Sequence, residues 1–267
     1  METPIECPLN TINVDRYLQS ITEHGYPQVS AIVKKVINHT HYVSFGELKG
    51  LLTTATHQFI DYLIDQQFIG ITVGSHKSDC WIMKIVCQLV PKCFDHMIGC
   101  YDVYTISSLS AMTSTIRDIC LFDDGLFSGI HMINILEILA EQLVDPQQYT
   151  IHIITGVCSF IAQYNIRTST NFGEIKFYYG EEIFDLQSLL GSEEIKALID
   201  FYQPQQGDND LYNQFPVYFS HKMPGEFSGL PFIYRGTFPF QGTPIPLIKG
   251  CPSDLDIEYP PIPYRKK

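Results

Sequence analysis

The stretch Ile119-Cys-Leu-Phe-Asp123-Asp124-Gly-Leu-Phe-Ser128-Gly129-Ile decides the fold expected of this chain. An apolar run ends in two adjacent carboxylates, Ser-Gly follows three residues later, and an amphipathic segment then continues to Leu143. This order is typical of a strand, a tight loop and a helix. The stretch therefore predicts an α/β protein.

Two readings of the loop stay open. A loop of small residues at a helix N-terminus offers unpaired N–H groups and the positive end of the helix dipole to an anion. Asp123 and Asp124 add ligands for Mg²⁺ or for sugar hydroxyls. The alternative is an exposed turn with two solvated aspartates and a glycine that permits a positive φ.

The pattern resembles the signature of the phosphoribosyltransferases: apolar strand, Asp-Asp, three residues, then Thr or Ser, then Gly. The resemblance implies that Asp123 and Asp124 are the catalytic carboxylates and contact the ribose of phosphoribosyl pyrophosphate (PRPP). Phe127 and His131 depart from the pattern, because the family often has Thr at these positions. The resemblance also implies a phosphate-binding loop made of Gly125, Leu126, Phe127, Ser128 and Gly129.

Phosphoribosyl transfer also needs cations to stabilise the departing pyrophosphate. The resemblance implies Mg²⁺ as cofactor, with Asp123 and Asp124 as metal ligands, and PRPP as donor substrate. Lys222 is a candidate substrate-binding cation, and a solvated surface lysine is the alternative for it. Residues 101–108, where the family usually has a pyrophosphate loop, contain neither glycine nor a cation.

Two functions therefore remain. The first is a phosphoribosyltransferase, a glycosyltransferase that acts on an acceptor the sequence does not reveal. The second is a catalytically inactive protein of the same fold, which binds a ribose phosphate or nucleotide as a sensor or docks on a protein partner as an effector.

Composition limits the binding partners and the cellular compartment that are expected for this chain. The 267 residues carry a formal charge of -12, which argues against nucleic acid as a partner. No window approaches 18 uncharged apolar residues, so no membrane span is expected. The polar start of the chain does not resemble a secretory signal, and the eight cysteines include no Cys-x-x-Cys pair. A cytoplasmic protein with free thiols is expected.

The N-terminal part, residues 1–79, is expected to be a small helical domain that resembles a winged helix. Helical spacing runs from Val29 to Asn38. A capping box at Ser44 and Glu47 predicts a short helix to Leu52. A third helix is expected from residue 53 or 54 to 66, and a strand over residues 68–73. The third helix has Asp61 and Asp65 but no Lys or Arg, which favours a protein-docking or structural role over DNA binding.

Residues 80–267 are expected to form a phosphoribosyltransferase-like α/β domain, with a parallel sheet and crossover helices. Strands are predicted near 97–104, 119–124, 149–154 and 176–179, and helices over 107–117 and 193–202. Thr155-Gly156 would end a strand beside the acidic pair, at the edge where such sheets bind ligands. His152 is expected to be a packed residue, and the segment from 231 onward an extended Pro- and aromatic-rich tail. An N-terminal winged-helix-like region followed by such a transferase-like domain resembles divergent bacterial phosphoribosyltransferase-like proteins of conflict or effector systems.

Overall fold

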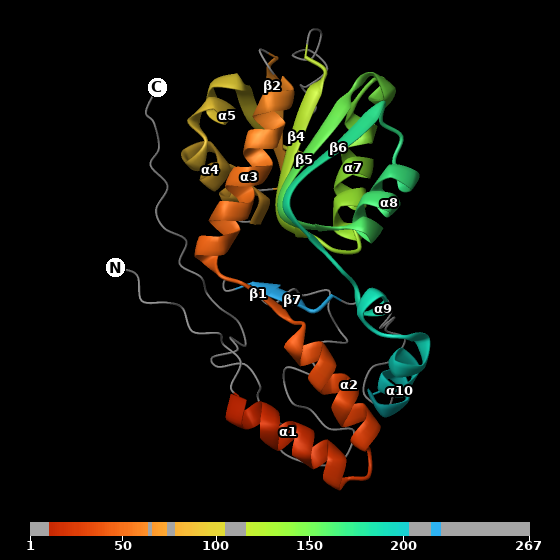
Figure 1. Ribbon diagram of the computed structural model, residues 1–267. Coiled ribbons are helices and arrows are strands. Elements are labelled where there is room, and N and C mark those ends of the chain that lie inside the picture. The colour runs from red at the N-terminus through yellow and green to blue at the C-terminus, as the bar shows by residue number, and fades with distance from the viewer. Residues whose placement is uncertain (1–10, 64–65, 74–77, 105–115, 203–214, 220–267) are drawn as a thin grey trace, which may run out of the picture. The chain divides into compact units, whose positions relative to one another are not determined.

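The computed structural model describes residues 11–63, 66–73, 78–104, 116–202 and 215–219 (Figure 1). The chain divides into two compact units, residues 1–44 with 186–267 and residues 45–185. The domain boundary expected after residue 79 falls inside the second of these units. The first unit is discontinuous, because it takes segments from both ends of the sequence.

The first unit contains short helices and one small parallel sheet. Strands β1 and β7 pair in parallel, with His41 opposite Val217 and Val43 opposite Phe219. A winged helix is not confirmed, because residues 68–72, the strand expected to complete it, belong to the second unit. The described elements of the first unit are α1 (Thr11–Glu23), α2 (Pro27–Asn38), β1 (His41–Val43), α9 (Leu186–Leu189), α10 (Ser192–Tyr202) and β7 (Val217–Phe219).

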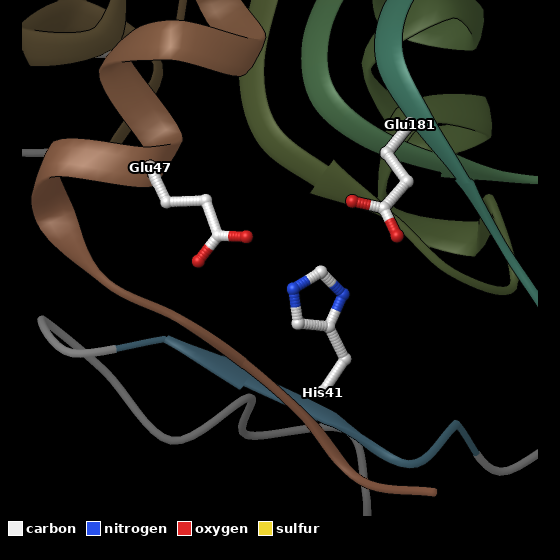
Figure 2. Close-up of side chains that lie close together, drawn as sticks. All are labelled: His41, Glu47 and Glu181. Carbon is white, nitrogen blue, oxygen red and sulfur yellow. The ribbon is translucent and has the colours of Figure 1, made fainter. Parts of the chain in front are cut away.

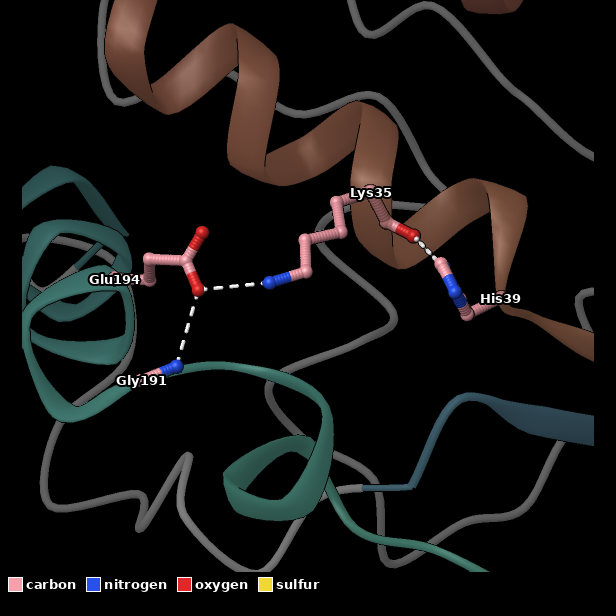
Figure 3. A network of polar contacts seen from close by, with 4 residues as sticks. All are labelled: Lys35, His39, Gly191 and Glu194. Carbon is pink, nitrogen blue, oxygen red and sulfur yellow. Dashed lines mark hydrogen bonds and ion pairs between the residues drawn. The ribbon is translucent and has the colours of Figure 1, made fainter.

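Helices from the two ends of the sequence hold the first unit together. The hydroxyls of Tyr17 on α1 and Tyr202 on α10 are 2.6 Å apart and both side chains are buried. At the surface, Figure 3 shows Lys35 of α2 reaching Glu194 of α10, with 2.9 Å between the Nζ and Oε2 atoms. The same Oε2 accepts the N–H of Gly191 at 3.0 Å. Half-exposed ion pairs contribute little to stability, so the buried contacts are what stabilise the packing of these helices.

The second unit alternates helices and strands. Pro91 opens α5, as expected of a residue that suits the first helical position. Ser159 caps α8 by accepting the N–H of Ala162 at 2.9 Å. The described elements of the second unit are α3 (Phe45–Leu63), β2 (Phe68–Thr72), α4 (Ser78–Leu89), α5 (Pro91–His96), β3 (Met97–Asp102), β4 (Asp118–Leu126), α7 (Ile130–Gln142), the 3-10 helix η1 (Pro146–Gln148), β5 (Thr150–Ser159), α8 (Phe160–Ser169) and β6 (Glu174–Ile183).

The second unit is built on a five-stranded sheet. The strand order is β3-β2-β4-β5-β6 and every pair is parallel. This confirms the expected α/β fold with a parallel sheet and crossover helices. The chain moves from β2 outward to β3 and then returns to place β4 on the other side of β2. The strand order therefore reverses between β2 and β4, and open α/β sheets bind ligands at the carboxyl edge of such a reversal.

Helices cover both faces of the sheet: α3, α4 and α5 lie on one side and α7 and α8 on the other (Figure 1). On the α3 side, glycines replace side chains where the helix touches the strands. A Cβ on Gly156 would lie 2.5 Å from Leu48 Cδ1, and one on Gly180 would lie 2.5 Å from Leu51 Cα. The buried core of the α7–α8 side includes Ile69, Ile71, Ile119, Leu121, Leu136, Leu139, Ile151, Ile153 and Ile166.

Residues 45–63 form one helix, so the expectation of two helices that meet near residue 53 is wrong. Thr53 and Thr54 do not cap a new helix. Their hydroxyls donate to carbonyl oxygens four residues back, Lys49 at 2.8 Å and Gly50 at 3.2 Å. A threonine can bond in this way inside a continuous helix, and the capping pattern therefore misplaced the boundary.

Several expectations fall outside the described residues. They are the helix over 107–117 except its last two residues, Lys222, and the tail from 231 onward. Among the helices that are described, none is both long and apolar enough to cross a bilayer.

Candidate functional site

The acidic pair lies within β4 and not after it. β4 continues to Leu126, which is paired in register with Cys158 of β5, while Gly125 is paired with Val157. The expected end of the strand at residue 124 is therefore two residues too early. Only residues 127–129 form the turn, because Gly125 and Leu126 still belong to the ladder.

Both aspartates are buried, although to different degrees. Asp123 keeps 8% of its surface exposed, whereas Asp124 is 0% exposed. Asp123 Oδ1 accepts the backbone N–H of Asp124 at 2.8 Å. Asp123 is therefore the one of the two that a ligand at this edge could reach without rearrangement of the strand.

The two carboxylates do not fit a single Mg²⁺ ion. Consecutive residues of an extended strand project to opposite faces of the sheet, so their oxygens diverge. Full burial of Asp124 also leaves no space for the water ligands that Mg²⁺ usually keeps. Of these two carboxylates, only that of Asp123 keeps any exposed surface.

Helix α8 holds the turn in place. Ser159 donates its hydroxyl to the carbonyl of Phe127, and Asn165 Nδ2 donates to the carbonyl of Ser128 at 2.9 Å. Gly129 has φ +81°, and a Cβ there would lie 3.0 Å from the carbonyl oxygen of Ala162. The turn therefore needs glycine at position 129 for both its conformation and its contact with α8.

The turn leads directly into α7, with Gly129 as the N-cap residue. The Oγ of Ser128 accepts the N–H of Ile130 at 3.4 Å, and the side chains of Ile130 and His131 are exposed. Leu126 and Phe127 are 3% and 8% exposed, so they can contribute to a loop only through their backbone. The anion-binding chemistry available here is the first turn of α7 and the Ser128 hydroxyl.

Across the reversal point, Asp79 adds a third carboxylate that the sequence did not single out. It accepts the N–H of Val73, which follows β2, and is 7% exposed. Its Oδ1 has no hydrogen-bond partner among the described residues. Burial raises the pKa of Asp79, while backbone N–H groups and the charge of His131 oppose that shift. The available signal was an acidic residue in the first turn of a helix, α4, the next helix in the chain after the apolar strand β2.

Two cavities of about 700 Å³ and about 680 Å³ lie elsewhere in the second unit. The first follows the early part of β6 and includes Tyr62, Arg167 and Lys176. The second includes His96 and Asp118, the first residue of β4. Neither cavity is lined by residues 123–129.

A buried polar chain connects side chains of these two cavities. His152 is 0% exposed, with Nε2 2.8 Å from Asp118 Oδ1 and Nδ1 3.2 Å from the hydroxyl of Tyr178. An ionised carboxylate only accepts, so Nε2 carries the proton that bonds Asp118. The rings of Phe59, Tyr62 and Tyr178 surround the imidazole. His152 is confirmed as a packed residue. Both of its ring nitrogens have hydrogen-bond partners, which fits a structural role.

Two further acidic side chains approach each other in the second unit. Figure 2 shows Glu47 on α3 and Glu181 on β6, with carboxylate oxygens within 4.8 Å of each other. His41, drawn in the same view, belongs to the first unit and does not count toward this pair. Two carboxylates on exposed or half-buried positions do not by themselves define a metal site.

No protein-family model matches the chain, and a search of the curated proteins finds no match. The candidate site therefore rests on its own geometry: Asp79 beyond β2, Asp123 on β4, and the turn into α7.

Proposed function

We propose that the chain binds a phosphorylated ribose, with PRPP as the first candidate, at the carboxyl edge of β2 and β4. The observation that carries the proposal is the position of the acidic strand and its glycine turn. Both lie beside the reversal of strand order, and the turn opens into the N-terminus of a helix of 13 residues. Ligands of open parallel sheets bind at this place.

Each part of the edge has a distinct role in this proposal. The first turn of α7 and the Ser128 hydroxyl hold the phosphate, because they supply N–H and O–H donors and a positive dipole. Asp123 accepts from the ribose hydroxyls. Gly129 keeps the turn close to α8, so the donors are held in a fixed arrangement before the ligand arrives.

Two activities are compatible with this binding mode. The first is transfer of the phosphoribosyl group to an acceptor. The second is binding without turnover, as in a sensor or an effector that signals through protein contacts. The complete burial of Asp124 favours the second, because a transferase of this type would use both carboxylates at the ribose.

Titration calorimetry tests the binding. PRPP and ribose 5-phosphate are titrated into the full chain, each with and without Mg²⁺. Asp123→Asn and Ser128→Ala are each expected to weaken binding about tenfold, a loss of about 1.4 kcal/mol. Glu137→Gln, which removes an exposed charge from the same helix, should leave the affinity unchanged. No heat from either ligand, or equal affinities for Asp123→Asn and wild type, would contradict the proposal.

Pyrophosphate release separates the two activities. Release from PRPP in the presence of a panel of nucleobases, abolished in Asp123→Asn, supports the transferase. Binding of PRPP without release under any of these conditions supports the sensor or effector.

A further inference from the structure

The cavity of about 700 Å³ lies along one edge of the five-stranded sheet. β6 is the last strand of that sheet, and among the described strands it pairs with β5 alone. The consecutive residues 172–178 line the cavity, together with Tyr62, Arg167 and Thr170. The first half of β6 therefore forms the wall of an open groove, which we call the β6 groove.

The β6 groove takes side chains from both faces of the sheet. On the α3 face, Lys176 Nζ is 3.7 Å from the centre of the Tyr62 ring. The Tyr178 ring lies on the same face, with its centre 5.3 Å from that of Phe59. Phe177 points the other way and packs against the core of the α7–α8 side. Because neighbouring side chains of a strand diverge, a groove lined by both sets lies at the outer edge of the strand.

The outer edge of a terminal strand has a defined chemistry. It presents a row of backbone N–H and C=O groups with which another extended segment can pair. Residues 174–178 give about 16 Å of such an edge, at about 3.3 Å per residue. This length matches a short extended peptide that adds one strand to the sheet.

Each face of the β6 groove carries one cation that lies over an aromatic ring. Lys176 lies over Tyr62 on the α3 face. On the other face, the Cζ atom of Arg167 is 4.8 Å from the centre of the Phe177 ring. These contacts hold both charges beside the edge of the strand. Successive residues of an added strand point to opposite faces, so two adjacent acidic residues would each meet one cation.

Glu174 is the one carboxylate among the described residues that line the groove. Its Oε2 is 2.9 Å from Lys176 Nζ, and 54% of the Glu174 side chain and 24% of the Lys176 side chain are exposed. An ion pair with this exposure is weak. A carboxylate of a bound peptide can therefore replace Glu174 as the partner of Lys176.

We propose that the β6 groove docks an extended acidic segment of a protein partner, which adds a strand next to β6. The backbone of the segment pairs with residues 174–178, one carboxylate meets Lys176, and the carboxylate of the adjacent residue meets Arg167. The partner segment is extended because the edge offers a row of backbone groups, and it is acidic because a cation flanks that row on each face. The groove contains none of residues 123–129, so this docking is independent of ribose-phosphate binding.

Fluorescence anisotropy of a labelled peptide, Thr-Val-Asp-Glu-Val-Thr-Val, tests the docking on the full chain. The peptide should bind saturably, and Asn-Gln in place of its Asp-Glu should weaken binding. Arg167→Gln and Lys176→Gln should each weaken binding about threefold to fivefold, the range of a partly exposed ion pair. Glu174→Gln should strengthen binding, because it removes the competing carboxylate. Lys92→Gln, which removes an exposed lysine of α5, is the matched control and should leave the affinity unchanged.

Two N-methylated forms of the same peptide test whether a strand is added. One carries the methyl groups on one set of alternate backbone nitrogens, and the other carries them on the remaining set. An added strand pairs with β6 through one of its edges, so only one of the two forms should lose binding.

Three results would overturn the docking site. They are no binding of the Asp-Glu peptide to the wild-type chain, equal affinity for the Asn-Gln peptide, and equal affinities of the two N-methylated forms. Sedimentation identifies the other possible occupant: a dimer that Lys176→Gln weakens, in a chain that binds no peptide, would assign the groove to a second copy and overturn the proposal. The peptide comparisons use the wild-type chain, so they decide even if a variant fails to fold.

Discussion

Replacement of Gly129 by alanine tests how strongly the turn after β4 depends on glycine. Two terms oppose the change. At φ +81° an L-residue costs about 1–2 kcal/mol. The new Cβ would also lie 3.0 Å from Ala162 O and 3.1 Å from Ile166 Cγ1. Relief of this crowding requires a shift of α8 and adds about 1 kcal/mol, the low end of overpacking penalties. We expect Gly129→Ala to lower the free energy of unfolding by about 2–3 kcal/mol.

Gly25 provides the matched control for this substitution. It has φ +91°, but a Cβ there would meet nothing within 4 Å. Gly25→Ala should therefore lose only the conformational term, about 1–2 kcal/mol. Urea unfolding followed by circular dichroism measures both variants, and fluorescence of Trp81, the single tryptophan, follows the second unit in Gly129→Ala. A loss under about 0.5 kcal/mol for Gly129→Ala would refute the role given to the turn.

Two other predictions concern the same unit. Burial raises the pKa of Asp79, so the folded protein binds this proton more tightly than the unfolded chain and the carboxylate destabilises the fold above its folded-state pKa. Asp79→Asn should be more stable than wild type at pH 7, with a difference that shrinks as the pH falls toward about 4; lower stability at pH 7 would mean that the charge itself is needed. Gly180→Ala places a Cβ 2.5 Å from Leu51 Cα and should lose about 1–3 kcal/mol in urea unfolding. Gly50→Ala on the exposed side of α3 should instead gain about 0.5–1 kcal/mol, and equal stabilities for the two variants would contradict the close approach of helix and strand.

The parallel sheet was predictable because its strands are short apolar runs separated by amphipathic segments. Residues 119–124 and 149–154 were each recognised in this way, and both lie in central strands. Residues 68–73 were also recognised as a strand, but their partners were not. Pairing of β2 with β3 and β4 is set by contacts with residues about 30 and 50 positions away, which local periodicity does not contain.

The sequence motif predicted where the candidate site lies and some of its residues, but not which side chains are buried. Asp123, Ser128 and Gly129 were found from the motif. The burial of Asp124 was not, because whether β4 ends before or after that residue depends on its register with β5. Asp79 was missed for a different reason. Its significance comes from a neighbour that only the fold provides, His131.

The charge balance at the edge of β2 and β4 constrains the ligand more strongly than the motif does. Asp79, Asp123 and Asp124 place three carboxylates there, and among the described residues the basic side chain that acts on Asp79 is His131, in the first turn of α7. PRPP carries several negative charges, and the dipole of one helix, equivalent to about half a charge, cannot balance them against these carboxylates. A bound pyrophosphate must therefore bring its own divalent cation or meet a cation from outside the described residues. Ribose 5-phosphate, with a single phosphate to place on α7, is under no such constraint. The comparison of the two ligands with and without Mg²⁺ thus tests whether this edge suits a sugar monophosphate or the pyrophosphate donor of a transferase.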